Sequence, residues 1–377
     1  MNILVIGNGF DLAHGLQTTY KDFLKFASFF TYNSRNPNEL NSYDNERTSS
    51  IEYFINFFDD DPKISDELDI LVKDNVWLTH FYNVQIKEGW IDFENEISKV
   101  IQTIEDIHKT INNNTNRLNK QVKVERYQQE ILQYFNPYIR YATEKTIKET
   151  KEKGLKDLNR LIRCLEIYLS FYINNVPLEK TLPDIERLPD IDKILSFNYT
   201  NTYERLYTRH PLPEFDYIHG KANIRNNVDT NNMVLGINEY LKGDEKNENI
   251  EFIAFKKFYQ RIHKETGSLY KNWVAEIKSD QKITNIHTGN NSIISDKEDS
   301  KHHNIFIFGH SLDITDKDVL RDLILNDNVQ TVIFYMNKDD YGRKIANLVK
   351  IIGQDELIRR TGGPTKTITF KLITEID

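Results

Sequence analysis

The sequence predicts an α/β protein with an open, mainly parallel sheet and a large inserted α-helical region. Short apolar runs, typical of buried strands, occur at the start of the chain and again in its second half. In the second half these runs alternate with helical patterns. Between the two sets, residues 51–175 carry apolar side chains three and four positions apart, as amphipathic helices do.

The chain of 377 residues is long enough for two domains, or for one domain with a large insertion. The strand-like runs assign residues 1–30 and 190–377 to a nucleotide-binding α/β core. The helical pattern assigns residues 31–189 to an inserted helical subdomain, which begins with a loop rich in Asn, Ser and Asp at 31–50.

Composition narrows the functional classes. The net charge of −8 and the pI of about 5.8 argue against general nucleic-acid binding. A single cysteine, Cys164, excludes an intrachain disulfide, and its apolar helix face predicts a buried structural thiol. The histidines show no metal-ligand spacing, so no metal is predicted. Without a signal sequence or an apolar run of roughly 18 residues, we expect a cytoplasmic chain with no membrane contact.

The first strand, residues 3–6, runs directly into a glycine turn. Gly7 and Gly9 end the strand, Asp11 follows, and a third glycine comes at Gly15. Small residues let a backbone approach a phosphate, and the amides of such a turn can point at the anion. The pattern G-x-G-x-x-G fails because the third glycine stands at 15 rather than 12, so a standard dehydrogenase loses support. A tight turn without a ligand is the plain alternative.

The remaining elements follow in order. Thr19 and Asp22 have the spacing of a reciprocal cap for a helix at 20–30. Long charged helices are expected over 117–153. Strands are expected at 194–197, 216–220, 233–236 and 304–311, where short apolar runs close on a polar residue or a glycine, and also at 331–335 and 368–373. Helices are expected at 249–278, 319–325 and 341–352, and a polar loop at 279–303.

Four predicted strand ends carry polar or glycine motifs, at residues 7–11, 198–200, 219–220 and 309–311. In open parallel sheets, ligands bind outside the carboxyl ends of the strands. We therefore expect these distant segments to meet at one crevice.

The side chains at these ends suggest acid–base chemistry. His219 can act as a general base near neutral pH, or fix a loop by hydrogen bonds. Asn198 can orient a water or a ribose hydroxyl, or simply cap a turn. Asp11 can bind a ribose hydroxyl or position a water, or cap the local helix. Thr200 can cap the helix that follows it.

These motifs carry a family resemblance. The opening ILVIGNGFDLAHGL closely resembles the AbiH family of bacterial proteins associated with abortive phage infection. The later segments FNYTNTYE, IHG and FGHSLDITDKDVL resemble motifs of the same family, and together they run from residue 3 to about 320. The resemblance implies a role in anti-phage defence.

AbiH-like proteins are in turn distantly similar to the sirtuin-like fold, which implies a Rossmann-like core with an NAD site. Its glycine spacing agrees at three positions, whereas Asp11, Gln17 and Thr200 depart from the sirtuin pattern and the four zinc cysteines are absent. Deacetylation therefore loses support. The residues expected to bind the nucleotide are Gly7, Asn8, Gly9, Phe10, Asp11, Gly15, Asn198, Gly309, His310 and Ser311.

Two functions follow from the resemblance. In the first, the protein is an NAD⁺ glycohydrolase that cleaves the nicotinamide–ribose bond, with His219, Asn198 and Asp11 in the chemistry. In the second, the crevice is a non-catalytic sensor of a nucleotide or ADP-ribose derivative. The helical insertion would then engage a partner protein or a second copy of the chain. A toxin acting on nucleic acid ranks last because the composition is acidic.

Overall fold

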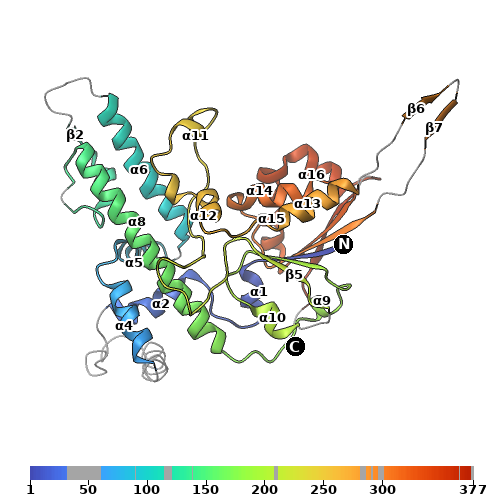
Figure 1. Ribbon diagram of the computed structural model, residues 1–377, viewed down its shortest axis with the longest axis horizontal. Helices are drawn as coiled ribbons and strands as arrows, with labels where there is room; N and C mark the ends of the chain where they lie inside the picture. Colours follow the sequence, from blue (N-terminus) through green and yellow to red (C-terminus); the bar gives the residue numbers. More distant parts are fainter. Residues whose placement is uncertain are drawn as a thin grey trace. The chain divides into compact units, whose positions relative to one another are not determined.

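A computed structural model describes residues 1–31, 61–89, 91–113, 121–137, 139–207, 211–280, 286–289, 292–295, 301–364 and 366–374 (Figure 1). The chain divides into two compact units. Unit 1 comprises Met1–Leu16, Pro177–Lys221 and Glu265–Asp377, and unit 2 comprises Gln17–Val176 and Ala222–Lys264. The domains drawn from the sequence, 1–30 with 190–377 and 31–189, stay a prediction. The compact units differ from them in residues 17–30, 177–189 and 222–264.

Unit 1 is built on a parallel sheet of six strands, as the sequence predicts. The strands are β1 (Asn2–Ile6), β4 (Lys193–Ser196), β5 (Glu214–Tyr217), β8 (His303–Phe308), β9 (Val329–Tyr335) and β10 (Ile368–Leu372). Their spatial order is β10-β9-β8-β1-β4-β5. Counted along the chain, this is the order 3-2-1-4-5-6 of dinucleotide-binding folds read from the other edge, and the order reverses between β1 and β8.

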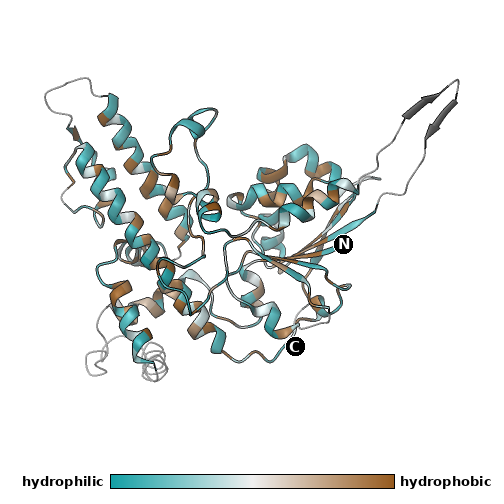
Figure 2. Ribbon diagram, viewed as in Figure 1, coloured by the Kyte–Doolittle hydropathy of each residue, from teal (hydrophilic) through white to brown (hydrophobic). Residues whose placement is uncertain are grey.

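Strand β1 is buried on both faces, which explains its unbroken apolar sequence. Ile3 and Val5 face one apolar core, whereas Leu4 and Ile6 face the other. Side chains of α13, α14 and α15, such as Trp273, complete the first core, and those of α1, α9 and α10 complete the second. Figure 2 shows the corresponding hydrophobic colouring along the sheet.

The helices of unit 1 are mostly short. They are α1 (Asn8–Ala13), α9 (Pro183–Glu186), α10 (Thr202–Leu206), α13 (Tyr270–Ser279), the 3-10 turn η5 (Ile314–Asp316), α14 (Lys317–Ile324), α15 (Lys338–Ile352) and α16 (Gln354–Thr361). The expected polar loop at 279–303 contains an antiparallel pair, β6 (Ile286–Gly289) and β7 (Ser292–Ser295).

Unit 2 contains most of the helices of the inserted region and also residues 17–30 and 222–264. Its elements are α2 (Tyr20–Thr31), α4 (Pro62–Val72), α5 (Val76–Glu88), α6 (Phe93–Asn113), β2 (Val122–Lys123), α7 (Arg126–Leu132), β3 (Tyr141–Ala142), α8 (Glu144–Ile167), the π-helix Tyr168–Tyr172, the 3-10 turns Ile173–Asn175 and Ile253–Phe255, α11 (Glu245–Glu248) and α12 (Lys257–His263). The Thr19–Asp22 cap is confirmed, because the Asp22 amide donates to Thr19 Oγ1 and the Thr19 amide donates to Asp22 Oδ2. The expected loop and helix over 32–60 lie outside the described residues.

Three sequence interpretations are wrong. Residues 233–236 form no strand, because the side-chain amide of Gln260 bonds both the Leu235 amide and the Leu235 carbonyl and takes the place of a neighbouring strand. The helical stretch 249–278 breaks at Glu265 and Gly267, whose φ angles are +51° and +68°. The charged stretch 117–153 holds β2, the short helix α7 and β3 before α8 begins.

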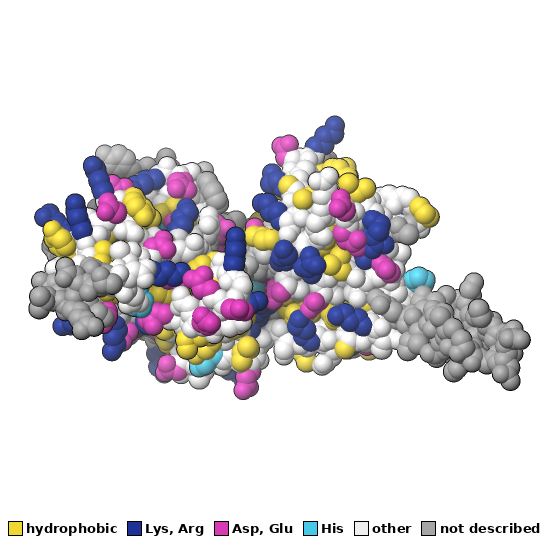
Figure 3. All heavy atoms as spheres, turned by 90° about the horizontal axis from the view of Figure 1, so that it is seen from above, with side chains coloured by type: hydrophobic (Ala, Val, Ile, Leu, Met, Phe, Trp, Pro, Cys, Tyr) yellow, Lys and Arg dark blue, Asp and Glu magenta, His cyan; other side chains and the backbone are white. Residues whose placement is uncertain are grey.

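The charges on one face of the molecule are mixed. On the face shown in Figure 3, basic and acidic side chains are interspersed, so this face offers no broad basic area to a nucleic-acid backbone.

Among the helices in the described part of the chain, none combines the length and the apolar character that crossing a membrane requires.

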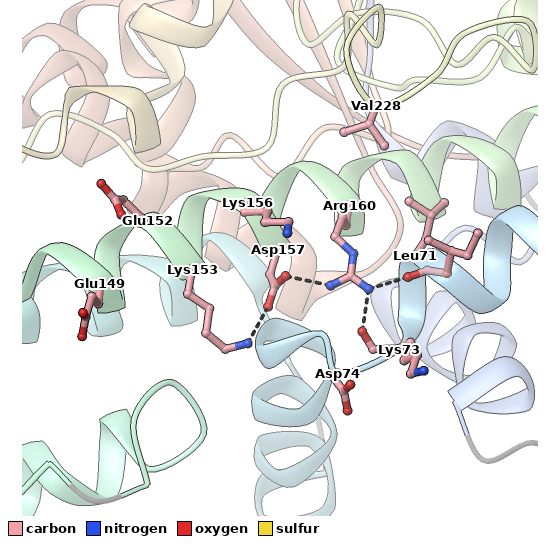
Figure 4. Close-up of a pocket in the computed structure, with 11 residues that line it drawn as sticks. Leu71, Lys73, Asp74, Glu149, Glu152, Lys153, Lys156, Asp157, Arg160 and Val228 are labelled. Atoms are coloured by element: carbon pink, nitrogen blue, oxygen red, sulfur yellow. Dashed lines mark hydrogen bonds and ion pairs between the residues drawn. The ribbon is translucent and has the colours of Figure 1, made fainter. Parts of the chain in front are cut away.

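A groove of ≈ 760 Å³ lies on unit 2, beside α8 and the turn between α4 and α5 (Figure 4). Two basic side chains of the groove, Lys153 and Arg160, form ion pairs with Asp157. Asp157 is 2% exposed and accepts hydrogen bonds from the Val76 amide and from Arg160, at 3.2 and 2.8 Å. Arg160 also donates to the carbonyls of Ile70 and Lys73. These bonds hold the α4–α5 turn against α8.

Replacing Asp157 by Ala should lower the free energy of unfolding by about 3 kcal/mol, because the Val76 amide and the Arg160 guanidinium lose a buried partner. Chemical denaturation of the full chain measures this change. The control is Lys156→Ala, an exposed position on the same groove, which should stay within about 0.5 kcal/mol of the wild type. Equal effects of the two substitutions would contradict this role for Asp157.

Candidate functional site

The residues predicted from the sequence gather at the carboxyl ends of four neighbouring strands of unit 1. Gly7 follows β1, Asn198 lies just beyond β4, His219 beyond β5 and Gly309 directly after β8. The strand order β8-β1-β4-β5 makes these ends adjacent. The expected convergence of these strand ends is therefore present in the fold.

The loops that follow β1 and β8 touch through their glycines. The Gly9 amide donates to the Gly309 carbonyl at 2.8 Å, and the Gly7 amide donates to the Phe308 carbonyl at 3.2 Å. A Cβ on Gly7 would lie 2.7 Å from the Cα of His310, and a Cβ on Gly9 would lie 2.8 Å from the Cα of Gly309. The glycines thus permit two backbones to pack together. Because both amides already have partners in the chain, phosphate binding by Gly7 and Gly9 stays a prediction.

Three further predicted residues lie at the exposed rim. Asn8 and Ser311 are exposed, and the Ser311 carbonyl accepts a hydrogen bond from Asn347 of α15. Gly15 is also exposed and follows α1 with a φ of +76°. No atom of the described residues would lie within 4 Å of a Cβ on Gly15, and its positive φ accounts for a glycine at this position. Phe10, by contrast, is fully buried in the core beneath β1.

Asp11 is the most buried polar residue of the predicted site. Its carboxylate is 1% exposed, and its Oδ2 accepts a hydrogen bond of 2.6 Å from the Thr200 hydroxyl. Its Oδ1 is buried and accepts no hydrogen bond from the described part of the chain. The prediction that Thr200 caps the next helix is wrong, because α10 begins at Thr202 after Asn201 and the Thr200 hydroxyl is directed to Asp11 instead.

Burial also governs the ionisation of Asp11. Desolvation raises its pKa from 3.8 to about 6, although the Thr200 hydrogen bond, the nearby polar groups of Thr202 and Asn198 and the positive charge of Arg205 act in the opposite direction. Asn198 also donates to the Gly7 carbonyl at 3.0 Å, so its amide ties the β4 end to the glycine turn. The site thus holds a buried carboxylate whose pKa is raised to about 6 and whose Oδ1 has no donor among the described residues.

A second cluster joins the ends of β5 and β8. His219 Nε2 lies 3.3 Å from Asp316 Oδ1, and His310 Nε2 lies 3.4 Å from Asp316 Oδ2. Each of the three residues is less than a tenth exposed. The ring of Phe197 packs against both imidazoles, with centroid distances of 5.6 Å to His219 and 4.2 Å to His310. One carboxylate thus lies between two histidines from different strand ends.

Sequence reasoning missed Asp316. The segment 315–318 resembles the start of a capped helix, and Asp316 does stand at the N-cap of α14. It makes no side-chain capping bond there, and the contact with the turn instead comes from Asp313, which accepts from the Thr315 amide. The sequence does place a carboxylate, Asp316, a few residues after His310 at a strand end, and this could have suggested their contact. It contains no pattern that predicts His219 as the second partner of Asp316.

Other chemistry finds little support in the described residues. There, no group of three or more His, Cys, Asp or Glu is arranged to hold a metal ion. Cys164 is fully buried, as expected, and burial raises the pKa of its thiol, which disfavours a nucleophilic thiolate.

Comparison with known proteins identifies the family. The family model described as bacteriophage abortive infection AbiH matches residues 3–337, which is most of the chain. The chain belongs to the AbiH family. It is therefore an abortive infection protein of anti-phage defence. No curated protein and no solved structure matches the chain.

The AbiH match covers β1 through β9 and includes every candidate site residue, from Gly7 to Asp316. The predicted AbiH resemblance is confirmed. The more distant sirtuin-like relation stays a prediction, and with it the NAD-binding roles that it implies.

Replacing Gly309 by Ala should lower the free energy of unfolding by at least about 2 kcal/mol. Its φ is +68°, and the added Cβ would lie 2.5 Å from the Gly9 carbonyl carbon. The matched control is Gly342→Ala in α15, where nothing lies within 4 Å and helix propensity should add about 1 kcal/mol. Thermal and chemical denaturation test the pair, and an unaltered stability of the Gly309 variant would contradict the close loop contact.

Asp11 should make stability fall as the pH rises from about 4 to about 6. A raised folded-state pKa means that ionisation costs free energy in the fold, here about 3 kcal/mol for about two units. This cost is absent below pH 3.8 and complete above pH 6. Asp11→Asn removes the titration, so its stability relative to the wild type should rise across this window. Denaturation at pH 4, 5, 6 and 7 measures the difference, and a constant difference would contradict the raised pKa.

Proposed function

We propose that this AbiH protein hydrolyses NAD⁺ at the carboxyl edge of the unit 1 sheet and releases nicotinamide. The observation that carries the proposal is the contact between His219 and Asp316, a histidine with a buried carboxylate partner at a strand end. The strand order of the sheet, which is that of dinucleotide-binding folds, also supports the proposal. A base with a fixed carboxylate partner suits proton removal from water or from a hydroxyl.

The reaction requires one bond to break and one to form. The C1′–N bond of the nicotinamide ribose breaks, and the nitrogen keeps the electron pair, so nicotinamide leaves as a neutral molecule. The oxygen of a water molecule bonds to C1′ while His219 takes its proton. The products are nicotinamide, ADP-ribose and one proton. Asn198 bonds the Gly7 carbonyl and so holds the glycine turn beside the reaction.

Asp11 fits the ribose part of such a substrate. Its Oδ1 is a buried acceptor without a hydrogen bond, and a ribose hydroxyl is a donor that would satisfy it. The glycines fit less directly. For a phosphate to use the Gly9 amide, that amide must exchange its bond to Gly309 for one to the phosphate oxygen. NAD⁺ binding at residues 7–15 therefore includes a separation of the two glycine loops.

A mass-spectrometric time course with NAD⁺ tests the proposal. Wild-type protein, with and without lysate from phage-infected cells, should release nicotinamide, and His219→Gln should lower the rate at least about 100-fold. The control His303→Gln removes another buried histidine, which lies 3.3 Å from Asp280 at the opposite end of β8, and should retain the wild-type rate.

Full turnover by the His219 variant would overturn the assigned base. Saturable NAD⁺ binding without nicotinamide release under every condition would overturn hydrolysis and favour the nucleotide sensor. Direct calorimetric titration of the same two variants distinguishes loss of binding from loss of chemistry.

A further inference from the structure

The protons on two imidazole rings can be placed from the contacts of the cluster formed by His219, Asp316 and His310. An ionised carboxylate can only accept hydrogen bonds, and each oxygen of Asp316 faces the Nε2 of one imidazole. The two contacts, 3.3 and 3.4 Å, use different oxygens of the same carboxylate. The state of either histidine is therefore tied to the orientation of Asp316.

His310 is held in one tautomer by its own loop. The Leu312 amide donates to His310 Nδ1 at 2.9 Å, so Nδ1 carries the lone pair and the neutral ring carries its proton on Nε2. That proton faces Asp316. The loop is itself fixed, because Lys344 of α15 donates to the His310 carbonyl at 2.6 Å and Leu312 has a φ of +58°.

The same reasoning then applies to His219. With one oxygen of Asp316 engaged by His310, the carboxylate cannot rotate freely, and its other oxygen faces His219 Nε2. An acceptor at that position requires Nε2 of His219 to be the protonated nitrogen. The lone pair of the neutral ring is then on Nδ1, which becomes the nitrogen that can accept a proton.

We infer that His310 is a positioning residue, which orients Asp316 so that His219 is held as the Nε2–H tautomer with Nδ1 as its basic nitrogen. This differs from the nucleotide-binding role that the sequence suggests for His310. The use of Nδ1 in hydrolysis rests on the proposed function, whereas the tautomer rests on the contacts alone.

Two substitutions at His310 separate its hydrogen bond with the Leu312 amide from its polar contact with Asp316. Gln carries an amide nitrogen near the position of Nε2 and can still donate to Asp316. Asn carries its oxygen near the position of Nδ1, so it can accept from the Leu312 amide but cannot reach Asp316. Both variants lose the ring contact with Phe197, so packing losses are shared and the polar contact with Asp316 is the difference between them.

Side-chain ¹⁵N NMR of histidine-labelled full-length protein, without any substrate, reads the tautomer directly. The chain has 10 histidines, and the missing resonances of His219→Gln assign that ring. Wild type and His310→Gln should show a His219 ring protonated on Nε2. His310→Asn should show a mixture of tautomers, and its nicotinamide release should fall at least about 10-fold below that of His310→Gln. Thermal unfolding and the other histidine resonances verify that both variants are folded.

A wild-type His219 protonated on Nδ1 would overturn the inference. So would an Nε2–H tautomer that persists unaltered in folded His310→Asn. If the variants fail to fold, Asp316→Asn provides the second test, because an amide can also donate and should mix the His219 tautomers. The expected tautomers without any nicotinamide release would leave the positioning role intact and contradict only the proposed hydrolysis.

Discussion

The close contact between the loops after β1 and β8 is the constraint on which the site depends. Two backbones approach until the Gly9 amide bonds the Gly309 carbonyl, and side chains at these positions would collide with the opposite loop. This contact lies where the strand order reverses, the usual place for a ligand in such sheets. Asp11 on α1, two residues after Gly9, accepts from Thr200 beyond β4, and His310, next to Gly309, contacts Asp316. Each cluster thus includes a residue within two positions of this contact.

Asp157 in unit 2 and Asp11 in unit 1 are both buried carboxylates, but they affect the stability of the protein in different ways. Asp157 in unit 2 has amide, guanidinium and ammonium partners, and it connects two helices. Asp11 in unit 1 leaves one oxygen without a donor and carries a raised pKa, so it is a local cost to stability. Groups that a fold retains at such a cost are concentrated at functional sites. This contrast supports the sheet edge, rather than the charged groove on α8, as the functional region.

Much of the architecture could be predicted from local patterns. The apolar run of β1 and the glycines after it depend on burial and backbone geometry, which a single segment reveals. The pairing of Asp316 with His219 could not be predicted, because it depends on a strand order that local sequence does not encode. The prediction that Thr200 caps a helix was wrong for a similar reason, because a hydroxyl before a helix can either cap that helix or bond a distant carboxylate. The run at 233–236 is buried but meets Gln260 rather than a strand.

The segment order of the two units also bears on synthesis at the ribosome. Strand β1 emerges first, yet its neighbours β4 and β8 lie about 190 and 300 residues later in the chain. All of unit 2, which ends at Lys264, is translated before β8 begins at His303. Contacts between such distant segments form late and slowly. A nascent chain interrupted before β8 would therefore contain the whole helical unit but lack His310 and Asp316, so the candidate site could form only after this part of the chain has been translated.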